Sequence, residues 1–514
     1  MMRAWKTWLV LLLILLFGAF LRLHSLSEFP PGLYPDEAMN GNNALEAIHG
    51  AVPFKMFYPE NNGREGLFIN IQAFFLNFFI RQTGTIEAWM LRVPSALFGI
   101  FTLLGIFLLT REMLKFAGEK ALRAVPLLAT FFAAASFWHV NFSRIGFRAI
   151  MAPFFLTWGL YLLFVALEWL RNRNERPFSR MLPFIAGFVY GLGFHSYIAY
   201  RVTPLLVLGI FVWIWLNRTI HKRFWNLFVW FTIGGLCAVL PLVVFFINHP
   251  QDFLGRTSQI SVFSSATPLW DLLKNIGLTL GSFFVYGDGN WRHNISGRPL
   301  LSPPVALFFL LGIVLLFRLL WKTFRKNKAA LGEHGWAPPL LVSGSWIAVG
   351  SLPVVISNEG IPHALRSILI IPPIMIISAI GCIHFFSVLK RRFGASGKGR
   401  ALIVIAPLVL ALVGFDGYWS YFHVWGKDPN TPAAFANNYV AIAQELNLLP
   451  SELPKYVVVE AGGTDVRGIP MPAQTVMFLT DTFLPAFQTA KNIHYILPKQ
   501  ESNIPQGAVV FRLR

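Results

Sequence analysis

Apolar runs about as long as a bilayer is thick recur along the whole chain, and they constrain its fold more than any other feature. A helix needs about 20 mostly apolar residues to cross the hydrocarbon core of a membrane. Of the 514 residues, 55% are hydrophobic and 13% are charged, roughly half of the ~25% charge of a soluble domain. We therefore expect an α-helical polytopic membrane protein with about eleven spans. The expected spans are residues 7–23, 91–110, 123–142, 148–170, 182–198, 203–217, 224–247, 303–321, 338–356, 367–388 and 401–420.

The lysines and arginines behind the formal net charge of +19 gather in short clusters between the apolar runs. The clusters lie at the N-terminus and at residues 111–123, 171–180, 218–223, 322–328 and 390–400. They fall in alternate loops, which is typical of the cytoplasmic loops of membrane proteins. The sequence thus predicts a multi-pass protein of the cytoplasmic (plasma) membrane with a cytoplasmic N-terminus. Membrane lipids, and not nucleic acid, are the partners that this distribution favours.

One apolar run, residues 66–80, conflicts with this alternation, because a crossing there would place every later basic cluster on the outer side. At about fifteen residues it is also short for a span. We expect a juxtamembrane or re-entrant helix within the first external loop, which covers about residues 24–90. Eleven crossings then place the two termini on opposite sides of the membrane.

The last ninety or so residues differ from the rest of the chain in having short apolar or alternating runs in place of long apolar ones. Residues 430–448 are predicted to be a helix, and residues 456–460, 475–479, 493–497 and 508–513 are predicted to be strands separated by Pro and Gly. We interpret residues 426–514 as a small extracytoplasmic α/β domain.

The first external loop carries adjacent carboxylates, Asp36 and Glu37, directly after Tyr34 and Pro35. An acid after proline at the start of a helix is often an N-cap. The alternative is a general base at the membrane surface that acts on an acceptor hydroxyl. Glu65 stands at the head of the apolar run in the same loop, where a charge needs a partner or must reach water.

Isolated cations mark the other external loops. Arg144 and Arg148 are four residues apart without an acid between them, as two arginines on one helical face would be. They either extend toward lipid headgroups or bind a phosphate, for which the planar guanidinium group is well suited. The same alternatives apply to the external segments that contain His195, Arg201, His363 and Arg366. The histidines are scattered singly, with no close ligand spacing, so no metal ligands are predicted.

The motifs YPDEA, GREGLFIN, SRIGFRAIMAPFF and PHALR together resemble the GT-C glycosyltransferase superfamily. The resemblance is to the branch with the protein O-mannosyltransferases and the lipid A aminoarabinose transferase, and it covers most of residues 1–390. It implies that residues 1–425 form a GT-C-like transmembrane catalytic domain with two juxtamembrane helices in the first external loop. The C-terminal domain is not covered.

The resemblance implies a hexosyl- or pentosyltransferase that uses a polyprenyl-phosphate sugar and acts on a lipid, glycan or protein hydroxyl outside the membrane. Asp36, with Glu37 beside it, is then the catalytic base of an inverting displacement. The substrate-binding residues are Arg64, Glu65, Arg144, Arg148, His195, Arg201, His363 and Arg366. The second external loop lacks the acidic metal ligands of diphosphate-using relatives, which favours a monophosphate donor and no required cofactor. The resemblance does not exclude a divalent cation near Asp36 or Glu65.

Two other functions remain as alternatives. A transporter or flippase of a lipid-linked or anionic substrate would also have many spans, although carriers usually place ionisable residues near the midplane and show internal repeats. A glycan polymerase or ligase with a diphosphate-linked donor would share the arginines without needing the early Asp-Glu pair.

Overall fold

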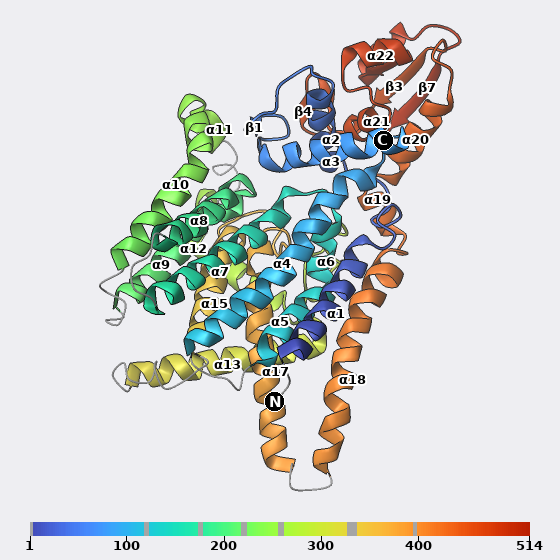
Figure 1. Ribbon diagram of the computed structural model, residues 1–514. Helices are drawn as coiled ribbons and strands as arrows, with labels where there is room; N and C mark the ends of the chain where they lie inside the picture. The colour runs from blue at the N-terminus through green and yellow to red at the C-terminus, as the bar shows by residue number, and fades with distance from the viewer. Residues whose placement is uncertain are drawn as a thin grey trace.

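The computed structural model describes residues 4–117, 123–172, 178–216, 224–254, 262–325, 337–393 and 398–514, and it is a bundle of long helices with a small α/β unit at one end (Figure 1). Within these residues, nine helices are long and apolar enough to cross a membrane. The protein is therefore a multi-pass membrane protein. The nine helices are α1 (Ala4–Leu23), α4 (Ala88–Ala117), α7 (Met151–Asn172), α9 (Thr203–Leu216), α10 (Phe224–Asn248), α13 (Pro303–Arg325), α15 (Ala337–Gly350), α17 (Ile371–Phe393) and α18 (Lys398–Trp419), some of them extended by short helical turns.

A bent pair of helices brings the number of candidate spans among the described residues to ten, if the pair counts as one span. Helices α5 (Ala124–Ala135) and α6 (Phe137–Arg144) pass the length and polarity test together but bend by 58°. Ser136 between them has an extended backbone, and its hydroxyl accepts a hydrogen bond from the backbone N–H of His139. The serine thus ends one helix and caps the next.

The remaining expected span, residues 182–198, corresponds to helix α8 (Phe178–Leu192), which has 15 described residues and is shorter than a full crossing. The turns η3 (Gly193–His195) and η4 (Ile198–Val202) follow it. Helix α8 packs against α10 with backbone touching backbone. A Cβ atom at Gly187 would lie 1.8 Å from the carbonyl oxygen of Phe231, and one at Gly234 would lie 2.0 Å from that of Phe184. Small residues allow this close approach in lipid, where backbone groups are already satisfied within each helix.

The segment predicted to be the first external loop lies across the upper end of the bundle in Figure 1 and keeps that name below. It contains α2 (Pro35–Ile48), the two-residue strands β1 (Phe57–Tyr58) and β2 (Arg64–Glu65), and α3 (Leu67–Thr83). The apolar run at 66–80 forms α3, which is not among the candidate spans and packs beside α2 and α4. The expectation of a juxtamembrane helix at this position is confirmed.

The basic end of α17, with Lys390, Arg391 and Arg392, lies at the opposite end of the bundle from the first external loop (Figure 1). The N-terminus points to that same end, and the C-terminus lies at the upper end. The basic cluster at 218–223 and parts of the clusters at 111–123, 171–180, 322–328 and 390–400 lie outside the described residues.

Residues 430–514 form the C-terminal unit. Its helices are α19 (Asn430–Ala434), α20 (Asn437–Leu448), α21 (Ala473–Leu479) and α22 (Pro485–Lys491), with the turn η9 (Pro498–Asn503). Strands β6 (Ile493–Ile496), β3 (Lys455–Val459) and β7 (Val509–Leu513) form a parallel sheet in the order β6-β3-β7. Strands β4 (Asp465–Val466) and β5 (Ile469–Pro470) form a separate small hairpin.

Two details of the C-terminal prediction are wrong. Residues 475–479 are part of helix α21, whose residues up to Phe478 are all buried between α20 and α2. Because a short apolar run that is buried all round has no diagnostic period, it does not distinguish a strand from a helix. The predicted helix at 430–448 is interrupted at Ala436, which has a left-handed backbone.

The C-terminal unit is tied to the first external loop by polar contacts. Arg467, in the β4–β5 turn, forms ion pairs with the buried Glu46 at 2.8 Å and with Glu60 at 2.9 Å. The Asn42 side chain donates a hydrogen bond to the Gln474 side chain, and the Thr475 hydroxyl donates one to the carbonyl of Leu33. The unit therefore rests on the loop that carries Asp36.

Candidate active site

Asp36 lies in the first turn of α2, after Pro35 has set the backbone for the helix start. Tyr34 occupies the N-cap position, and no side chain caps this helix, so Asp36 does not act as the N-cap. Its half-buried carboxylate accepts a hydrogen bond of 2.9 Å from the Asn61 side chain. Asn61 has a left-handed backbone with φ of 54°.

Glu37 points into the protein and is fully buried. Its Oε2 atom accepts hydrogen bonds from Arg92 Nε at 3.2 Å and from the Gly146 backbone N–H at 2.7 Å. Arg92 also donates to the carbonyls of Pro30 and Gly32. The pair therefore fixes the start of α2 to α4 and to the segment before η2 (Arg148–Ile150), while Asp36 remains half-exposed beside it.

Glu65 forms ion pairs with two arginines from two other segments that were predicted to be external. Arg148 Nε lies 2.9 Å from Glu65 Oε2, and Arg201 Nη2 lies 3.6 Å from Glu65 Oε1. Glu65 is 3% exposed, whereas the two arginine side chains are 16% and 24% exposed. One carboxylate thus faces two guanidinium groups, and the cluster carries an excess positive charge that is open to an anion. We call Glu65, Arg148 and Arg201 the arginine cluster.

Arg64 adds a buried positive charge beside this cluster. Its guanidinium group donates to the side-chain oxygens of Asn40 and Asn43 on α2. Burial, followed by the positive charge of Arg148, lowers the pKa of Arg64 to about 10, while the charge of Asp36 acts in the opposite direction. Arg64 is therefore within electrostatic reach of both Asp36 and Arg148, and it fixes β2 against α2.

Arg144 does not share the position of Arg148. Helix α6 ends at Arg144, Ile145 is extended, and η2 begins at Arg148, so the expected single helical face is wrong. The buried Arg144 guanidinium donates to the carbonyls of Leu21, Ser25 and Phe29. It anchors the end of α1 and the residues after it to α6, and these hydrogen-bond acceptors are not part of the arginine cluster.

The remaining predicted residues lie in other surroundings. His195 is buried in η3, and its Nε2 atom is hydrogen-bonded to the carbonyl of Ala238 on α10. Arg366 contacts the Ser357 hydroxyl and both the backbone and the carboxylate of Glu359. These contacts hold the turn before η7 (Ile368–Ile370) in place.

Arg292 is a further residue at this site that was not predicted from the sequence, and it lies against Tyr34, two residues before Asp36. The Arg292 guanidinium carbon stands 3.9 Å from the centre of the Tyr34 ring. Burial and then the negative charge of Asp36 raise the pKa of Tyr34, and Arg292 opposes this shift. The dense polar run of residues 286–298 between two apolar stretches was the available signal for this segment.

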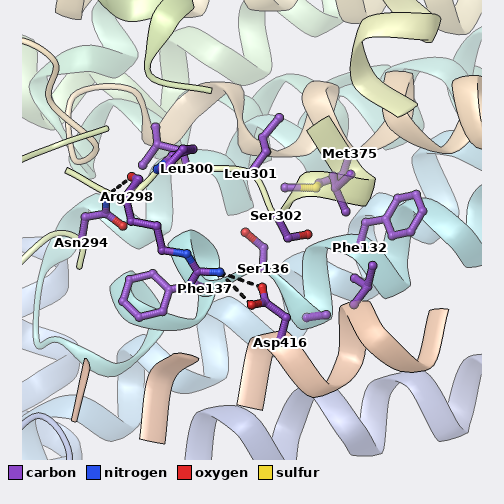
Figure 2. A pocket seen from close by; sticks show the side chains of 14 residues that line it. Phe132, Ser136, Phe137, Asn294, Arg298, Leu300, Leu301, Ser302, Met375 and Asp416 are labelled. Atoms are coloured by element: carbon purple, nitrogen blue, oxygen red, sulfur yellow. Dashed lines mark hydrogen bonds and ion pairs between the residues drawn. The ribbon is translucent and has the colours of Figure 1, made fainter. Parts of the chain in front are cut away.

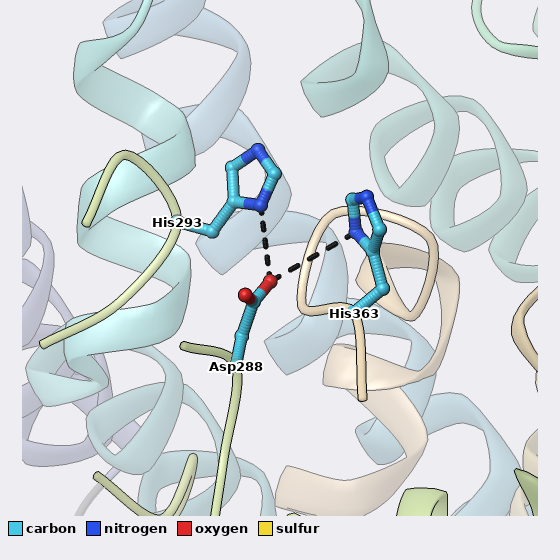
Figure 3. Close-up of side chains that lie close together, drawn as sticks. All are labelled: Asp288, His293 and His363. Carbon is cyan, nitrogen blue, oxygen red and sulfur yellow. Dashed lines mark hydrogen bonds and ion pairs between the residues drawn. The ribbon is translucent and has the colours of Figure 1, made fainter. Parts of the chain in front are cut away.

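The fold also brings together three groups that are far apart in the sequence. Asp288 Oδ2 lies 3.0 Å from His293 Nδ1 and 3.9 Å from His363 Nδ1 (Figure 3). Burial, followed by the positive charges of His293 and Arg366, lowers the pKa of His363 to about 3. Burial alone would raise the pKa of Asp288, but its hydrogen bond with His293 lowers it. Within the described residues, these are the side chains that meet the geometry of a metal-holding group.

A separate pocket lies below these loops, where the α5–α6 break faces α17, α18 and the segment before α13 (Figure 2). Figure 2 shows the Arg298 side chain reaching across it to Asp416 of α18, with a distance of 2.8 Å from Nη2 to Oδ2. Ser136 and Ser302 add hydroxyls to an otherwise largely apolar wall. The lining includes none of the residues predicted from the sequence to bind substrate or to act in catalysis.

Comparisons with known proteins give matches in structure only. No family model and no curated protein sequence matches the chain. The Archaeoglobus fulgidus oligosaccharyltransferase tethered with an acceptor peptide matches with a TM-score of 0.54 at 13% identity. That alignment covers 97% of this chain but 64% of the archaeal one, so this chain spans less than two thirds of that protein's length.

Two further matches have a lipid phosphate bound. ArnT from Cupriavidus metallidurans bound to undecaprenyl phosphate matches with a TM-score of 0.51 at 12% identity, over 99% of this chain and 90% of that one. AglB from Archaeoglobus fulgidus in complex with an inhibitory peptide and a dolichol-phosphate matches with a TM-score of 0.54 at 14% identity, over 93% and 64%.

Proposed function

From the GT-C fold, which this chain shares with these membrane glycosyltransferases, we propose that the protein moves a sugar from a polyprenyl-phosphate donor to an acceptor hydroxyl. One observation carries this proposal. A half-buried carboxylate, Asp36, and Arg148 of the arginine cluster are both within electrostatic reach of Arg64, which follows Asp36 in the same loop. A base and an anion site are what such a transfer requires.

Asp36 acts as the general base in this mechanism. It accepts the proton of the acceptor hydroxyl as the acceptor oxygen attacks the anomeric carbon of the donor sugar. The bond from the anomeric carbon to the phosphate oxygen breaks in the same step, and the electron pair leaves with the polyprenyl phosphate. A single displacement of this kind inverts the anomeric configuration. The Asn61 side chain orients the Asp36 carboxylate through a hydrogen bond. Glu37 fixes the first turn of α2 through its hydrogen bond with the Gly146 backbone N–H.

Arg148 and Arg201 stabilise the departing phosphate. Each already shares Glu65, so their guanidinium planes are fixed before the donor arrives. The charge on the phosphate increases as the bond to the sugar breaks, and pre-oriented cations lower the energy of that state. Arg64 contributes a more distant buried charge. These cations suit a monophosphate, because its leaving group needs less neutralisation than a diphosphate.

The donor class is supported by what the similar structures hold. One was determined with undecaprenyl phosphate and another with a dolichol-phosphate. The sugar, hexose or pentose, and the acceptor, whether lipid, glycan or protein, remain part of the proposal. We place the reaction on the outer face of the plasma membrane, because the basic end of α17 lies at the opposite end of the bundle from the site.

Purified protein incubated with labelled polyprenyl-phosphate sugars and envelope fractions tests the proposal. We expect label in a product for the wild type, and a loss of about 10²–10⁴-fold in Asp36→Asn, the range for removal of a general base. Glu445→Gln, which removes an exposed carboxylate of the C-terminal unit, is the matched control and should keep full activity. Wild-type transfer by Asp36→Asn would rule out the base assignment.

The same assay separates the alternative functions. Movement of labelled lipid across the bilayer without a new glycosidic bond would replace the transferase with a flippase or transporter. Use of diphosphate-linked donors alone would identify a polymerase or ligase instead.

A further inference from the structure

Asp288, His293 and His363 take no part in the proposed transfer, yet they converge from two external segments. Asp288 and His293 belong to the turn between α12 (Pro268–Gly281) and α13, and His363 belongs to the turn before η7. Figure 3 shows both imidazole rings directed at the same carboxylate. Asp288 and His293 are buried, and the His363 side chain is 17% exposed. Groups of this kind are rarely buried together without a partner.

The backbone fixes the carboxylate of Asp288 before any ligand arrives. Its Oδ1 atom accepts a hydrogen bond of 2.8 Å from the N–H of Asn290, and its Oδ2 atom accepts one of 2.8 Å from the N–H of Ala364. The second bond joins the two external segments directly. The Trp138 indole supports this junction by donating to the carbonyl of Ala364.

Hydrogen bonding to Asp288 explains the position of the His293 ring but not that of the His363 ring. His293 Nδ1 lies 3.0 Å from Asp288 Oδ2, which is a normal hydrogen-bond distance. His363 Nδ1 lies 3.9 Å from the same oxygen, which is too far for a hydrogen bond, and it accepts a bond from the Arg366 N–H at 3.4 Å. Because Nδ1 has a single lone pair, a cation between His363 Nδ1 and Asp288 Oδ2 would take the place of this long hydrogen bond. The same cation would replace the hydrogen bond of His293, whose remaining proton would then be on Nε2.

We propose that Asp288, His293 and His363 bind one divalent cation of the zinc class through Asp288 Oδ2 and the Nδ1 atoms of both histidines. Two imidazoles and one carboxylate are a donor set for zinc, whereas magnesium and calcium prefer oxygen ligands. Bond lengths of about 2.0–2.2 Å in a tetrahedral site separate neighbouring ligand atoms by about 3.4 Å. The ligand atoms here are separated by 3.0 Å and 3.9 Å, and all lie within 4.8 Å of one another.

Such a cation would lock the two external segments together beside the candidate active site. Arg292 precedes the ligand His293, and its guanidinium group covers the Tyr34 ring at the start of the helix that carries Asp36. The side chain of Asn141 holds the same turn by donating to the carbonyl of Arg292. The cation would thereby position Arg292, and its binding does not depend on the sugar-transfer proposal.

Zinc binding to the metal-depleted full-length protein in detergent tests the site. Isothermal titration with ZnCl₂ should give one site per chain, and MgCl₂ should give none of similar affinity. Asp288→Asn, His293→Gln and His363→Gln should each weaken zinc binding by about 10-fold or more. His494→Gln, which changes a histidine of the C-terminal unit that is hydrogen-bonded to Asn492, should bind zinc as the wild type does.

Cobalt(II) bound to the wild-type protein provides a second measurement that needs no variant to fold. X-ray absorption at the cobalt edge should show two imidazole ligands and oxygen donors. No stoichiometric binding, a cobalt site without imidazole, or unchanged zinc affinity in all three folded variants would each overturn the proposal. Asp36→Asn should bind zinc normally. A protein that binds zinc at this site but never transfers sugar would refute the proposed function and leave the metal site standing.

Discussion

Asp36 and Glu37 are neighbours in sequence, but their side chains lie in different surroundings because consecutive residues of a helix point about 100° apart. Asp36 stays half-exposed with one hydrogen bond from Asn61. Glu37 is buried against Arg92 and the Gly146 backbone. A carboxylate that must exchange protons with a substrate needs access, so Asp36 fits the role of base and Glu37 fits that of a positioning residue.

Glu37→Gln should therefore reduce stability, whereas Asp36→Asn should not. Removing the charge of Glu37 leaves Arg92 buried without its counter-ion, which costs about 3–5 kcal/mol when one partner of a buried pair is lost. Thermal unfolding in detergent should show a clear decrease in Tm for Glu37→Gln and a change of about 0.5 kcal/mol or less for Asp36→Asn. Equal losses in the two variants would contradict the separation of roles.

Arg148 and Arg144 also have separate roles, the first in donor binding and the second in stability. Arg148→Gln should raise the donor KM by about 10-fold or more, because a charge-assisted contact is worth roughly 1.5–3 kcal/mol. Arg144→Gln should instead lower the Tm, since it leaves one buried and two part-buried carbonyls without this donor. Steady-state kinetics over a range of donor concentrations, with a melting curve for each variant, checks both expectations. An unchanged donor KM in Arg148→Gln would remove the arginine cluster from the donor site.

At the scale of the elements, the spacing of the apolar runs predicted the spans. The packing of the spans depends on where a glycine of one helix lies against the backbone of another. The α8–α10 contact has no room for a Cβ atom at Gly187 or Gly234. Helix α8 is shorter than its apolar run predicted, because two short turns replace the helix beyond Leu192. The boundaries and the breaks depend on tertiary contacts, and no local pattern of residues records those contacts.

Gly187→Ala should destabilise the bundle through this contact. Its new methyl group would press on the backbone of Phe231, which cannot move as a flexible side chain would, and overpacking of this kind costs about 1–3 kcal/mol. Gly209→Ala, on α9, is the matched control because a Cβ atom added there would meet no other atom within 4 Å. In detergent, the Tm of Gly187→Ala should be lower than that of Gly209→Ala. Equal Tm values for the two variants would refute the close packing.

At the scale of the whole molecule, Arg467 couples the C-terminal unit to the loop that carries the candidate base. Glu60 is a partner in this contact, and its hydrogen bond with Arg467 lowers the pKa of Glu60 although burial opposes the shift. A carboxylate with a lowered pKa in the folded state stabilises that state above its unfolded pKa of about 4.5. This contribution disappears as the pH falls through the lowered value.

Arg467→Ala should therefore loosen the C-terminal unit from the bundle at neutral pH and remove the acid-dependent part of the contact. Limited proteolysis should cleave the segment around residue 430 faster in the variant than in the wild type at pH 7. The part of the difference that comes from Glu60 should disappear as the pH falls through the lowered pKa of Glu60, since protonated Glu60 no longer pairs with Arg467, whereas the ion pair with Glu46 is a separate contribution. Equal cleavage at pH 7 would show that apolar packing alone holds the unit.

The sequence by itself determined the membrane class, the approximate positions of most spans and the juxtamembrane place of the apolar run at 66–80. These follow from hydrophobic length and charge, which are local and additive along the chain. Only the tertiary structure decided which charged residues meet. It joined Glu65 to Arg148 and Arg201, turned Arg144 toward backbone carbonyls, and brought His363 to Asp288 and His293 from a distant part of the chain. Those contacts depend on directions in space, and sequence spacing does not specify directions once helices bend and break.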